Sequence, residues 1–208
     1  MKKLLSILIL TVLLVTSLPS CAKEPRLDDY KDEMVALIEA SYEINDIFFG
    51  EGLPTYKRGG EFDNEYHIYG DSEQYMAYEY VVQNEKYLFT DQIKWAAEKV
   101  YTAEYLDDIY TMAFDGYADE NTGAVTTARY IDVNSWIMKY SYGDTDPFNV
   151  LPGNRRYDFD TVEIVKPYSK TYISITIDSY LEGDSEILPV TLRFKRTENG
   201  LRLDTPTY

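Results

Sequence analysis

The sequence has little of the usual catalytic chemistry: it contains one cysteine, Cys21, and one histidine, His67, among 208 residues. A disulfide needs two cysteines, so the chain cannot form an internal one. Zinc sites draw most of their ligands from Cys and His, so a zinc hydrolase is not expected. A Ser–His–Asp or Cys–His set would have to use His67, which has no partner motif nearby. We therefore favour a non-enzymatic role, although whether the protein is an enzyme stays open.

Basic residues are also scarce, with 20 Lys and Arg against 36 Asp and Glu. No acid lies in residues 1–20, so residues 21–208 carry 18 basic and 36 acidic side chains and a net charge of −18. A field of that sign repels nucleic acid and anionic lipid headgroups. There is no basic patch, no paired-cysteine motif and no glycine-rich phosphate loop. We expect no nucleic-acid partner, no cofactor and no metal.

No apolar run is long enough to cross a membrane. The longest, Leu4 to Val15, has about a dozen residues, where a spanning helix needs roughly 20. Lys2 and Lys3 precede it, and small residues follow it. A positive start, a short apolar run and a small-residue end are typical of a secretory signal peptide, which we predict over residues 1–20.

The signal ends in Leu18-Pro19-Ser20-Cys21, which resembles the lipobox of bacterial lipoproteins. The leucine three positions before Cys21 and the small residue just before it carry the likeness. In that family, the cysteine is diacylated and the signal is cleaved in front of it. The resemblance implies lipidation of Cys21 and a protein held on the extracytoplasmic face of the cell membrane. The alternative is a secreted protein with an unrelated cysteine at the cleavage site.

Beyond the anchor, we expect a tether over residues 21–27 and a single α+β domain over residues 28–208. Hydrophobic periodicity predicts a helix from Asp28 to Phe49. Its buried face would contain Met34, Leu37, Ile38, Ser41, Ile44 and Phe48. Two more helices are predicted, each after a threonine cap: Asp91–Tyr101 after Thr90, and Ala103–Phe114 after Thr102.

The remaining pattern predicts strands joined by tight turns. The expected strands are Tyr75–Val82, Ala128–Val133, Trp136–Tyr142, Tyr157–Lys166, Thr171–Leu181, Ile187–Arg196 and Leu201–Thr205. Asn134-Ser135 and Asn199-Gly200 are the clearest turns between them. Within Thr171–Leu181, Ile173, Ile175 and Ile177 alternate with polar residues, which predicts one buried and one solvated face. Helices first and an antiparallel meander last indicate an α+β fold.

Two stretches are similar to segments of small exported proteins of the nuclear-transport-factor-2-like superfamily. They are KWAAEKVYTAEYLDDIY, from Lys94 to Tyr110, and KRTENGLRLDTPTY, from Lys195 to Tyr208. The resemblance implies a cone in which N-terminal helices pack on a curved antiparallel sheet and close a cavity. Some members of that superfamily are enzymes, and many exported ones are binding or accessory domains.

Four residues are the first candidates for ligand binding: Arg129, Tyr130, Trp136 and Arg202. Strand alternation predicts that Arg129 and Tyr130 point to opposite faces of the sheet. Because basic residues are scarce, an arginine at the mouth of a cavity would suit an anion or a carboxylate. The alternative is an Arg–Asp pair that holds the sheet together.

Other groups of acidic residues are weaker candidates for a functional site. Asp144, Asp146 and Asn149 offer oxygen ligands for calcium, but the twelfth position of that loop is Arg155 rather than Glu, so a solvated turn is favoured. Asp158 and Asp160 share one side of a strand, as Asp132 and Asn134 nearly do. Paired acids can do general acid–base work, but chance pairs are expected among 36 acids.

Three functions are consistent with these features. The first is a membrane-anchored, non-catalytic binding or accessory domain for a small molecule, a peptide or a cell-wall fragment. The 21 tyrosines suit such a role because tyrosine covers apolar surface and keeps a wet hydroxyl. The second is a protein-interaction module, such as an inhibitor of a cell-wall hydrolase, whose acidic surface would occlude a basic cleft. The third is a cone-fold enzyme of the dehydratase or isomerase type.

Overall fold

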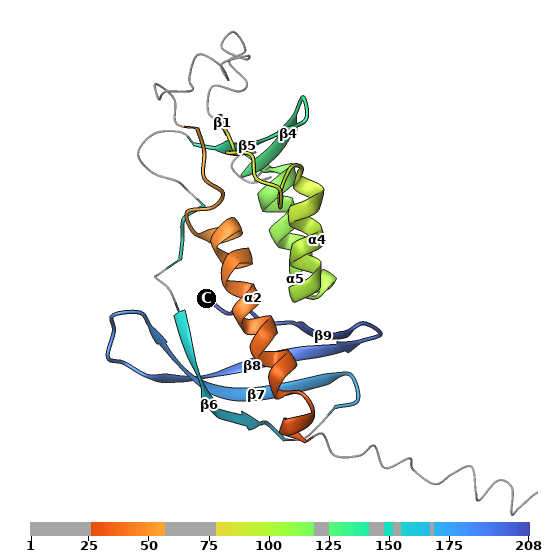
Figure 1. The fold of residues 1–208 in the computed structure, drawn as a ribbon, viewed down its shortest axis with the longest axis vertical. Helices are drawn as coiled ribbons and strands as arrows, with labels where there is room; N and C mark the ends of the chain where they lie inside the picture. The colour runs from red at the N-terminus through yellow and green to blue at the C-terminus, as the bar shows by residue number, and fades with distance from the viewer. Residues whose placement is uncertain (1–25, 57–77, 119–124, 142–147, 152–154, 167–168) are drawn as a thin grey trace, which may run out of the picture.

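The computed structural model describes residues 26–56, 78–118, 125–141, 148–151, 155–166 and 169–208. Cys21 and His67 lie outside these residues, as do Asp144 and Asp146. The body is elongated, with a four-stranded sheet toward one end, a three-stranded sheet at the other, and helices between them (Figure 1). Helices and antiparallel sheets make this an α+β fold, as the sequence predicts.

The helical elements come before most of the strands. They are η1 (Leu27–Asp29), α2 (Lys31–Phe49), α4 (Thr90–Val100), α5 (Ala103–Tyr110) and the π-helical turn η3 (Thr111–Asp115). The predicted long helix is confirmed as α2, but it begins at Lys31, and Asp28 and Asp29 belong to η1 instead. The six residues expected on its inner face are all buried. The helix α2 therefore runs along the middle of the elongated body, between the two larger sheets (Figure 1).

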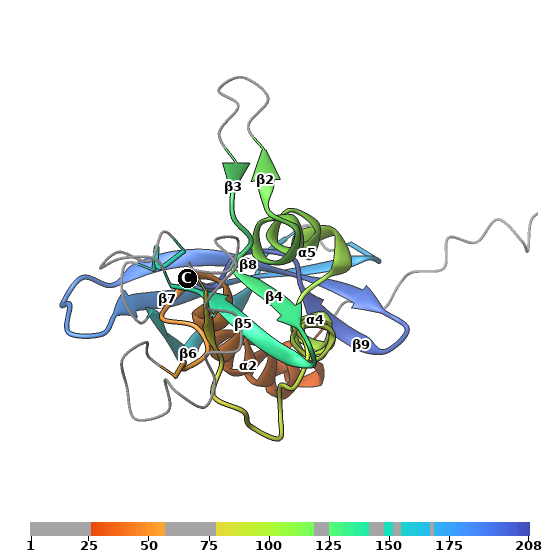
Figure 2. The ribbon, with the colours of Figure 1, turned by 90° about the horizontal axis from the view of Figure 1, so that it is seen from above.

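The strands form three antiparallel groups. β6 (Arg155–Ile164), β7 (Tyr172–Leu181), β8 (Leu188–Thr197) and β9 (Gly200–Leu203) make a four-stranded meander in sequence order. β1 (Tyr78–Tyr80), β5 (Trp136–Tyr140) and β4 (Tyr130–Val133) pair in that order in the second sheet. β2 (Tyr117–Ala118) and β3 (Val125–Thr126) pair only with each other. Seen from above, this short pair projects away from the body (Figure 2).

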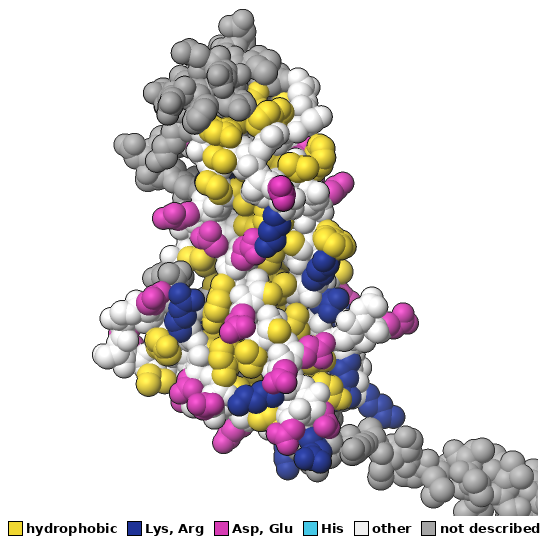
Figure 3. All heavy atoms as spheres, in the orientation of Figure 1, with side chains coloured by type: hydrophobic (Ala, Val, Ile, Leu, Met, Phe, Trp, Pro, Cys, Tyr) yellow, Lys and Arg dark blue, Asp and Glu magenta, His cyan; other side chains and the backbone are white. Residues whose placement is uncertain are grey.

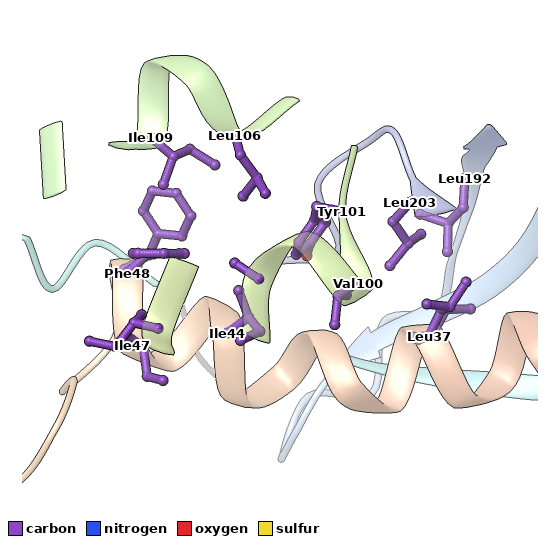
Figure 4. Close-up of a cluster of buried hydrophobic side chains, with 14 of the residues drawn as sticks. Leu37, Ile44, Ile47, Phe48, Val100, Tyr101, Leu106, Ile109, Leu192 and Leu203 are labelled. Atoms are coloured by element: carbon purple, nitrogen blue, oxygen red, sulfur yellow. The ribbon is translucent and has the colours of Figure 1, made fainter. Parts of the chain in front are cut away.

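The core lies where α2, the helical pair and the four-stranded sheet meet. Figure 4 shows Leu37 of α2 with Leu192 and Leu203 of the sheet at one end of this core, and Phe48 with Leu106 and Ile109 at the other. In β7, Ile173, Ile175 and Ile177 are at most 2% exposed, which confirms the predicted alternation. Truncating one such isoleucine to alanine costs about 2–5 kcal/mol of stability.

A buried polar network attaches the C-terminal residues to two helices. The amide of Asn45 donates to the Thr207 hydroxyl at 2.8 Å, and the Tyr101 hydroxyl donates to the Asn45 carbonyl oxygen at 2.8 Å. The hydroxyls of Ser41 and Thr207 lie 2.6 Å apart. Burial raises the pKa of Tyr101 to about 12. Ser41, a polar residue on the apolar face of α2, is thus explained by its hydrogen bonds.

The two shorter helices differ in how they begin. Thr102 accepts a hydrogen bond from the Tyr105 N–H, as expected of an N-cap. Thr90 is instead the first residue of α4, and its hydroxyl donates to the Asp132 carboxylate at 2.6 Å. The cap of α4 therefore comes from the hairpin β4–β5.

The turn of that hairpin is the predicted Asn134-Ser135 pair. Both residues have positive φ, 49° and 70°, which a type I′ turn requires at its two central positions. The register places Val133 opposite Trp136 directly across this turn. The hairpin is therefore tight, and it brings Asp132 to the start of α4.

Candidate functional site

A groove of about 250 Å³ runs between α2 and α4. It is lined by Ala40, Glu43, Ile44, Lys86, Tyr87, Gln92, Trp95, Ala96, Lys99 and Val100. Figure 3 shows this face of the molecule, where hydrophobic side chains lie among basic and acidic ones over the helices. We call this feature the α2–α4 groove.

The floor of the groove is apolar. Ile44 of α2 and Val100 of α4 are 2% and 5% exposed, so they belong to the core as well as to the groove. Ala40 and Ala96 stand on the facing helices and leave room above this floor because their side chains are short. The same apolar side chains therefore belong to the hydrophobic core and form the floor of the groove.

One wall of the groove is Trp95, whose side chain is 62% exposed. Ile93, Ala97 and Val100 form the buried face of α4, so helical periodicity turns Trp95 away from the core. The ammonium of Lys99, one turn further along the helix, lies 3.1 Å from the centroid of the Trp95 ring. This cation–π contact orients the indole and keeps a positive charge at the rim.

The apolar surface continues past the start of α4. Leu88 and Phe89 are 39% and 43% exposed, and they immediately precede the helix. Gln92, which lines the groove, accepts hydrogen bonds from the backbone N–H groups of both residues. Exposed apolar side chains beside a groove add apolar area that a ligand could cover.

The one carboxylate in the groove, Glu43, is already engaged on both oxygens. Its Oε2 pairs with the Lys86 ammonium, and its Oε1 accepts from the Tyr87 hydroxyl at 3.0 Å. The hydrogen bond to Glu43 raises the pKa of Lys86, and burial raises the pKa of Tyr87. Both groups therefore keep their protons at neutral pH, so both remain hydrogen-bond donors to Glu43.

The loop that carries Lys86 and Tyr87 is held in place by Asn84. The side-chain oxygen of Asn84 accepts from the Lys86 N–H at 2.9 Å and from the Tyr87 N–H at 2.8 Å. Such a turn fixes the backbone without help from secondary structure. The wall opposite Trp95 is therefore pre-formed.

Among the residues predicted from the sequence to bind a ligand, Arg129 and Tyr130 come together at the C-terminal end of α2. Arg129 is fully buried and donates to the carbonyl oxygens of Phe48 at 2.7 Å, Gly50 at 2.5 Å and Phe148 at 3.1 Å. The hydroxyl of Tyr130 donates to the Ile47 carbonyl at 3.0 Å. Both residues bind the free carbonyl groups at the helix end, where the dipole favours a cation.

The other two predicted residues lie elsewhere. Trp136 of β5 packs edge-on against Tyr80, with ring centroids 5.6 Å apart. Arg202 of β9 donates to the backbone carbonyls of Glu98 and Leu201, at 2.8 and 2.6 Å. The structure thus does not gather the four residues into one site, and a ligand-binding role for them stays a prediction.

The acidic pairs singled out in the sequence have local roles. Asp158 accepts from the Asp160 N–H at 3.1 Å, next to the register shift in β6. Asp132 caps α4, and Asn134 forms the hairpin turn. No group of three potential metal ligands occurs in the part of the chain that the structure describes.

A second hollow, beside Tyr42, Arg155, Arg156 and Tyr208, measures about 40 Å³. A single water molecule occupies on the order of 10–15 Å³ on this measure, so the hollow has room for only a few waters. Arg155 and Arg156 already bind Ser179 and Glu182 there. The α2–α4 groove is thus the better candidate of the two.

Sequence reasoning missed the α2–α4 groove. Trp95 was visible as a tryptophan beside the apolar face of its helix, with a lysine four positions later. That spacing was a usable signal, but Glu43, which lines the same groove and pairs with Lys86, comes from a helix about fifty residues earlier. Only the packing of α2 against α4 brings these side chains together.

Comparison with known proteins adds no relative to this picture: the chain matches no protein-family model and no curated protein sequence. Within the described residues, no helix has both the length and the apolar character needed to cross a membrane. The function must therefore be argued from the α2–α4 groove itself.

Proposed function

We propose that the protein is a membrane-anchored, extracytoplasmic binding domain that receives its ligand in the α2–α4 groove without catalysing a reaction. The observation that carries the proposal is Trp95, a tryptophan left 62% exposed on the wall of a pre-formed apolar groove. Tryptophan is among the residues most enriched at binding hot spots.

The energy available at this residue is considerable. A tryptophan side chain buries roughly 150–250 Å² when fully covered. At about 25 cal/mol per Å², covering the exposed part of Trp95 gives roughly 2–4 kcal/mol. A ligand that fits between Trp95 and the wall formed by Tyr87 would gain that free energy with little rearrangement of the protein.

The hydrogen bonds already made by its one described carboxylate support a non-catalytic role for the α2–α4 groove. General acid–base catalysis often uses an Asp or Glu side chain that is free to exchange a proton with the substrate. Both oxygens of Glu43 are hydrogen-bonded to neighbouring side chains. Among the described residues that line the groove, Glu43 is the one carboxylate.

The location rests on Leu18-Pro19-Ser20-Cys21 and the signal that precedes it. The described chain starts at Arg26, at the end of the body nearer the four-stranded sheet, and α2 rises from there toward the three-stranded sheet (Figure 1). With lipid on Cys21, the four-stranded sheet would lie nearest the membrane, and the groove would open to the side of the upright helix α2.

The cone of the nuclear-transport-factor-2-like superfamily remains part of this proposal. An antiparallel meander backing a long helix and a helical pair supports it. The separate three-stranded sheet is not part of the four-stranded meander, so the meander and the helices are the part to superimpose on a solved cone structure. An experimental structure whose sheets superimpose on such a cone would support the assignment, and a different strand order would remove it.

The anchor can be tested by metabolic labelling with a fatty-acid probe. We expect label on the wild-type protein and none on the Cys21→Ala variant, which should also leave the membrane fraction. Labelling that is equal in both proteins, or absent from both, would contradict the anchor. The groove is not involved, so this test is independent of ligand binding.

The α2–α4 groove can be tested in cells by photo-crosslinking. A photoreactive phenylalanine analogue in place of Leu88 lies beside the groove residue Gln92, and the same analogue in place of Ile187 lies at an exposed site in the loop between β7 and β8. We expect a specific adduct from position 88 that is lost when Trp95→Ala is added, and none from position 187. Equal adducts at the two positions, or no adduct at position 88, would argue against the groove.

A further inference from the structure

We infer that the ligand of the α2–α4 groove is an acid with an apolar body, held by the Lys99 ammonium beside the Trp95 ring. This inference rests on the proposed function, because it takes the groove as the binding site. In the groove, the side-chain acceptors already receive hydrogen bonds from the protein, whereas some side-chain donors do not have an acceptor among the described residues.

The acceptors in the groove are used. Glu43 receives Lys86 on one oxygen and Tyr87 on the other. The side-chain oxygen of Gln92 receives the N–H groups of Leu88 and Phe89. A ligand that brought further donors would have to share an oxygen that already accepts a hydrogen bond, or displace the donor bound to it.

The donors are not all used. Lys99 contacts the Trp95 ring, and no carboxylate within the described residues lies within ion-pair distance of its ammonium. The amide nitrogen of Gln92 has no hydrogen-bond acceptor among those residues. The groups left for a ligand are therefore donors, and they favour an acceptor or an anion.

The charge of the groove points the same way. Its lining contains two lysines and one glutamate, in a protein whose residues 21–208 carry a net charge of −18. Lys86 and Glu43 neutralise each other, which leaves the charge of Lys99 over an apolar floor. Lys99 is exposed, so an ion pair with a ligand there is a surface pair worth up to about 1 kcal/mol.

Size limits the ligand. Drug-sized ligands occupy pockets of roughly 300–1,000 Å³, so a groove of about 250 Å³ suits one ring or one apolar side chain. The chemistry that fits is a carboxylate next to an aromatic or branched aliphatic group. A free small acid with one aromatic ring or one branched aliphatic group supplies it.

The test compares two probes that differ only in charge. N-acetyl-phenylalanine carries the carboxylate, and N-acetyl-phenylalaninamide replaces it with a neutral amide. Binding of each to the full lipoprotein in detergent is measured by titration calorimetry at low salt. We expect the acid to bind about fivefold more tightly than the amide, which is the effect of one exposed ion pair of about 1 kcal/mol.

Variants then assign the preference to Lys99. Lys99→Gln should reduce the preference to less than about twofold, and Lys99→Arg should retain it. Trp95→Ala should weaken both probes equally, since it removes the apolar platform. The matched control is Lys94→Gln on the same helix, whose ammonium lies over the Phe114 ring at 4.8 Å, away from the groove. It should change nothing.

Equal binding of acid and amide, or a preference that survives Lys99→Gln, would overturn the inference. Failure of both probes to bind would overturn it as well. If a crosslink at position 88 still depends on Trp95, the α2–α4 groove is still supported as the binding site, and only the inference of an acidic ligand is wrong. If that crosslink also fails, the proposed function falls with it.

Discussion

The carboxylate of Asp132 accepts hydrogen bonds from both the backbone N–H and the hydroxyl of Thr90, at 3.1 and 2.6 Å. Asp132 belongs to β4 and Thr90 begins α4, so a strand of the small sheet supplies the cap of the helix that carries Trp95. A negative group at a helix N-terminus also interacts favourably with the helix dipole. This contact fixes one wall of the α2–α4 groove to the rest of the fold.

Removing that cap should destabilise the protein. Asp132→Ala leaves the Thr90 N–H and hydroxyl without their acceptor, and we expect a loss of about 1–2 kcal/mol in the free energy of unfolding. Urea denaturation followed by circular dichroism measures it. Asp107→Ala, in the exposed face of α5, is the control and should change stability by less than about 0.5 kcal/mol. Equal losses in the two variants would show that Asp132 does not act as a cap.

Arg129 should contribute more to stability than any exposed arginine. Its guanidinium donates to three main-chain carbonyls at the end of α2 and in the segment around Phe148. Arg129→Met removes these charge-assisted hydrogen bonds and should cost at least about 3 kcal/mol by urea denaturation. Arg129→Lys should recover little, because one ammonium cannot reproduce the planar fork. A loss no larger than that of Arg156→Met, at a partly exposed surface pair, would contradict this role.

Alkaline pH should unfold the protein through its buried tyrosines. Burial raises the pKa of Tyr101 from the ordinary 10.0 to about 12, and it raises the pKa of Tyr110 and Tyr157 as well. Between the ordinary pKa of 10.0 and the raised pKa of about 12, the folded state binds more protons than the unfolded state. The free energy of unfolding therefore has its full value below about pH 10 and falls as the pH rises toward about 12. Urea midpoints measured across this range should fall steadily.

Tyr101→Phe should reduce this alkaline loss while lowering stability at neutral pH. It removes the hydroxyl that donates to Asn45, which should cost about 1–2 kcal/mol. Tyr180→Phe, with an exposed side chain, is the control and should alter neither quantity. An unchanged alkaline profile in Tyr101→Phe would mean that other groups govern the transition.

The hairpin turn offers a stabilising substitution. Ser135 has a φ of 70°, a conformation that costs free energy for any residue with a Cβ atom. Ser135→Gly creates the Asn-Gly pair preferred by type I′ turns and should stabilise the protein by about 0.5–1 kcal/mol. The melting temperature measures the gain. Ser174→Gly, in the middle of β7, should lower it, and a fall for both variants would contradict the assigned turn.

The parts of the fold set by local pattern were predictable from the sequence. The buried face of α2, the alternation in β7, the Thr102 cap and the Asn134-Ser135 turn each depend on residues a few positions apart. Contacts between distant segments were not predictable. Thr90 is satisfied by a carboxylate 42 positions away, which no local rule reveals.

The candidate site illustrates the same limit. Strand alternation placed Arg129 and Tyr130 on opposite faces, yet both side chains are buried and both reach the end of α2. The reason is that β4 begins at Tyr130, so Arg129 lies before the strand and escapes its alternation. The α2–α4 groove, by contrast, arises from packing between two helices. In the sequence, only Trp95 indicates it, because this tryptophan lies outside the apolar face of its helix.

The most direct test of the account is the mass of the complex taken from cells. The lipoprotein is extracted from envelopes in mild detergent, and its native mass is compared with its denatured mass. We expect an added mass from a small acidic ligand in the wild type and in Ile187→Ala, and none in the double variant Trp95→Ala, Lys99→Gln. An added mass that persists in the double variant, or its absence from every sample, would contradict a ligand held between Trp95 and Lys99.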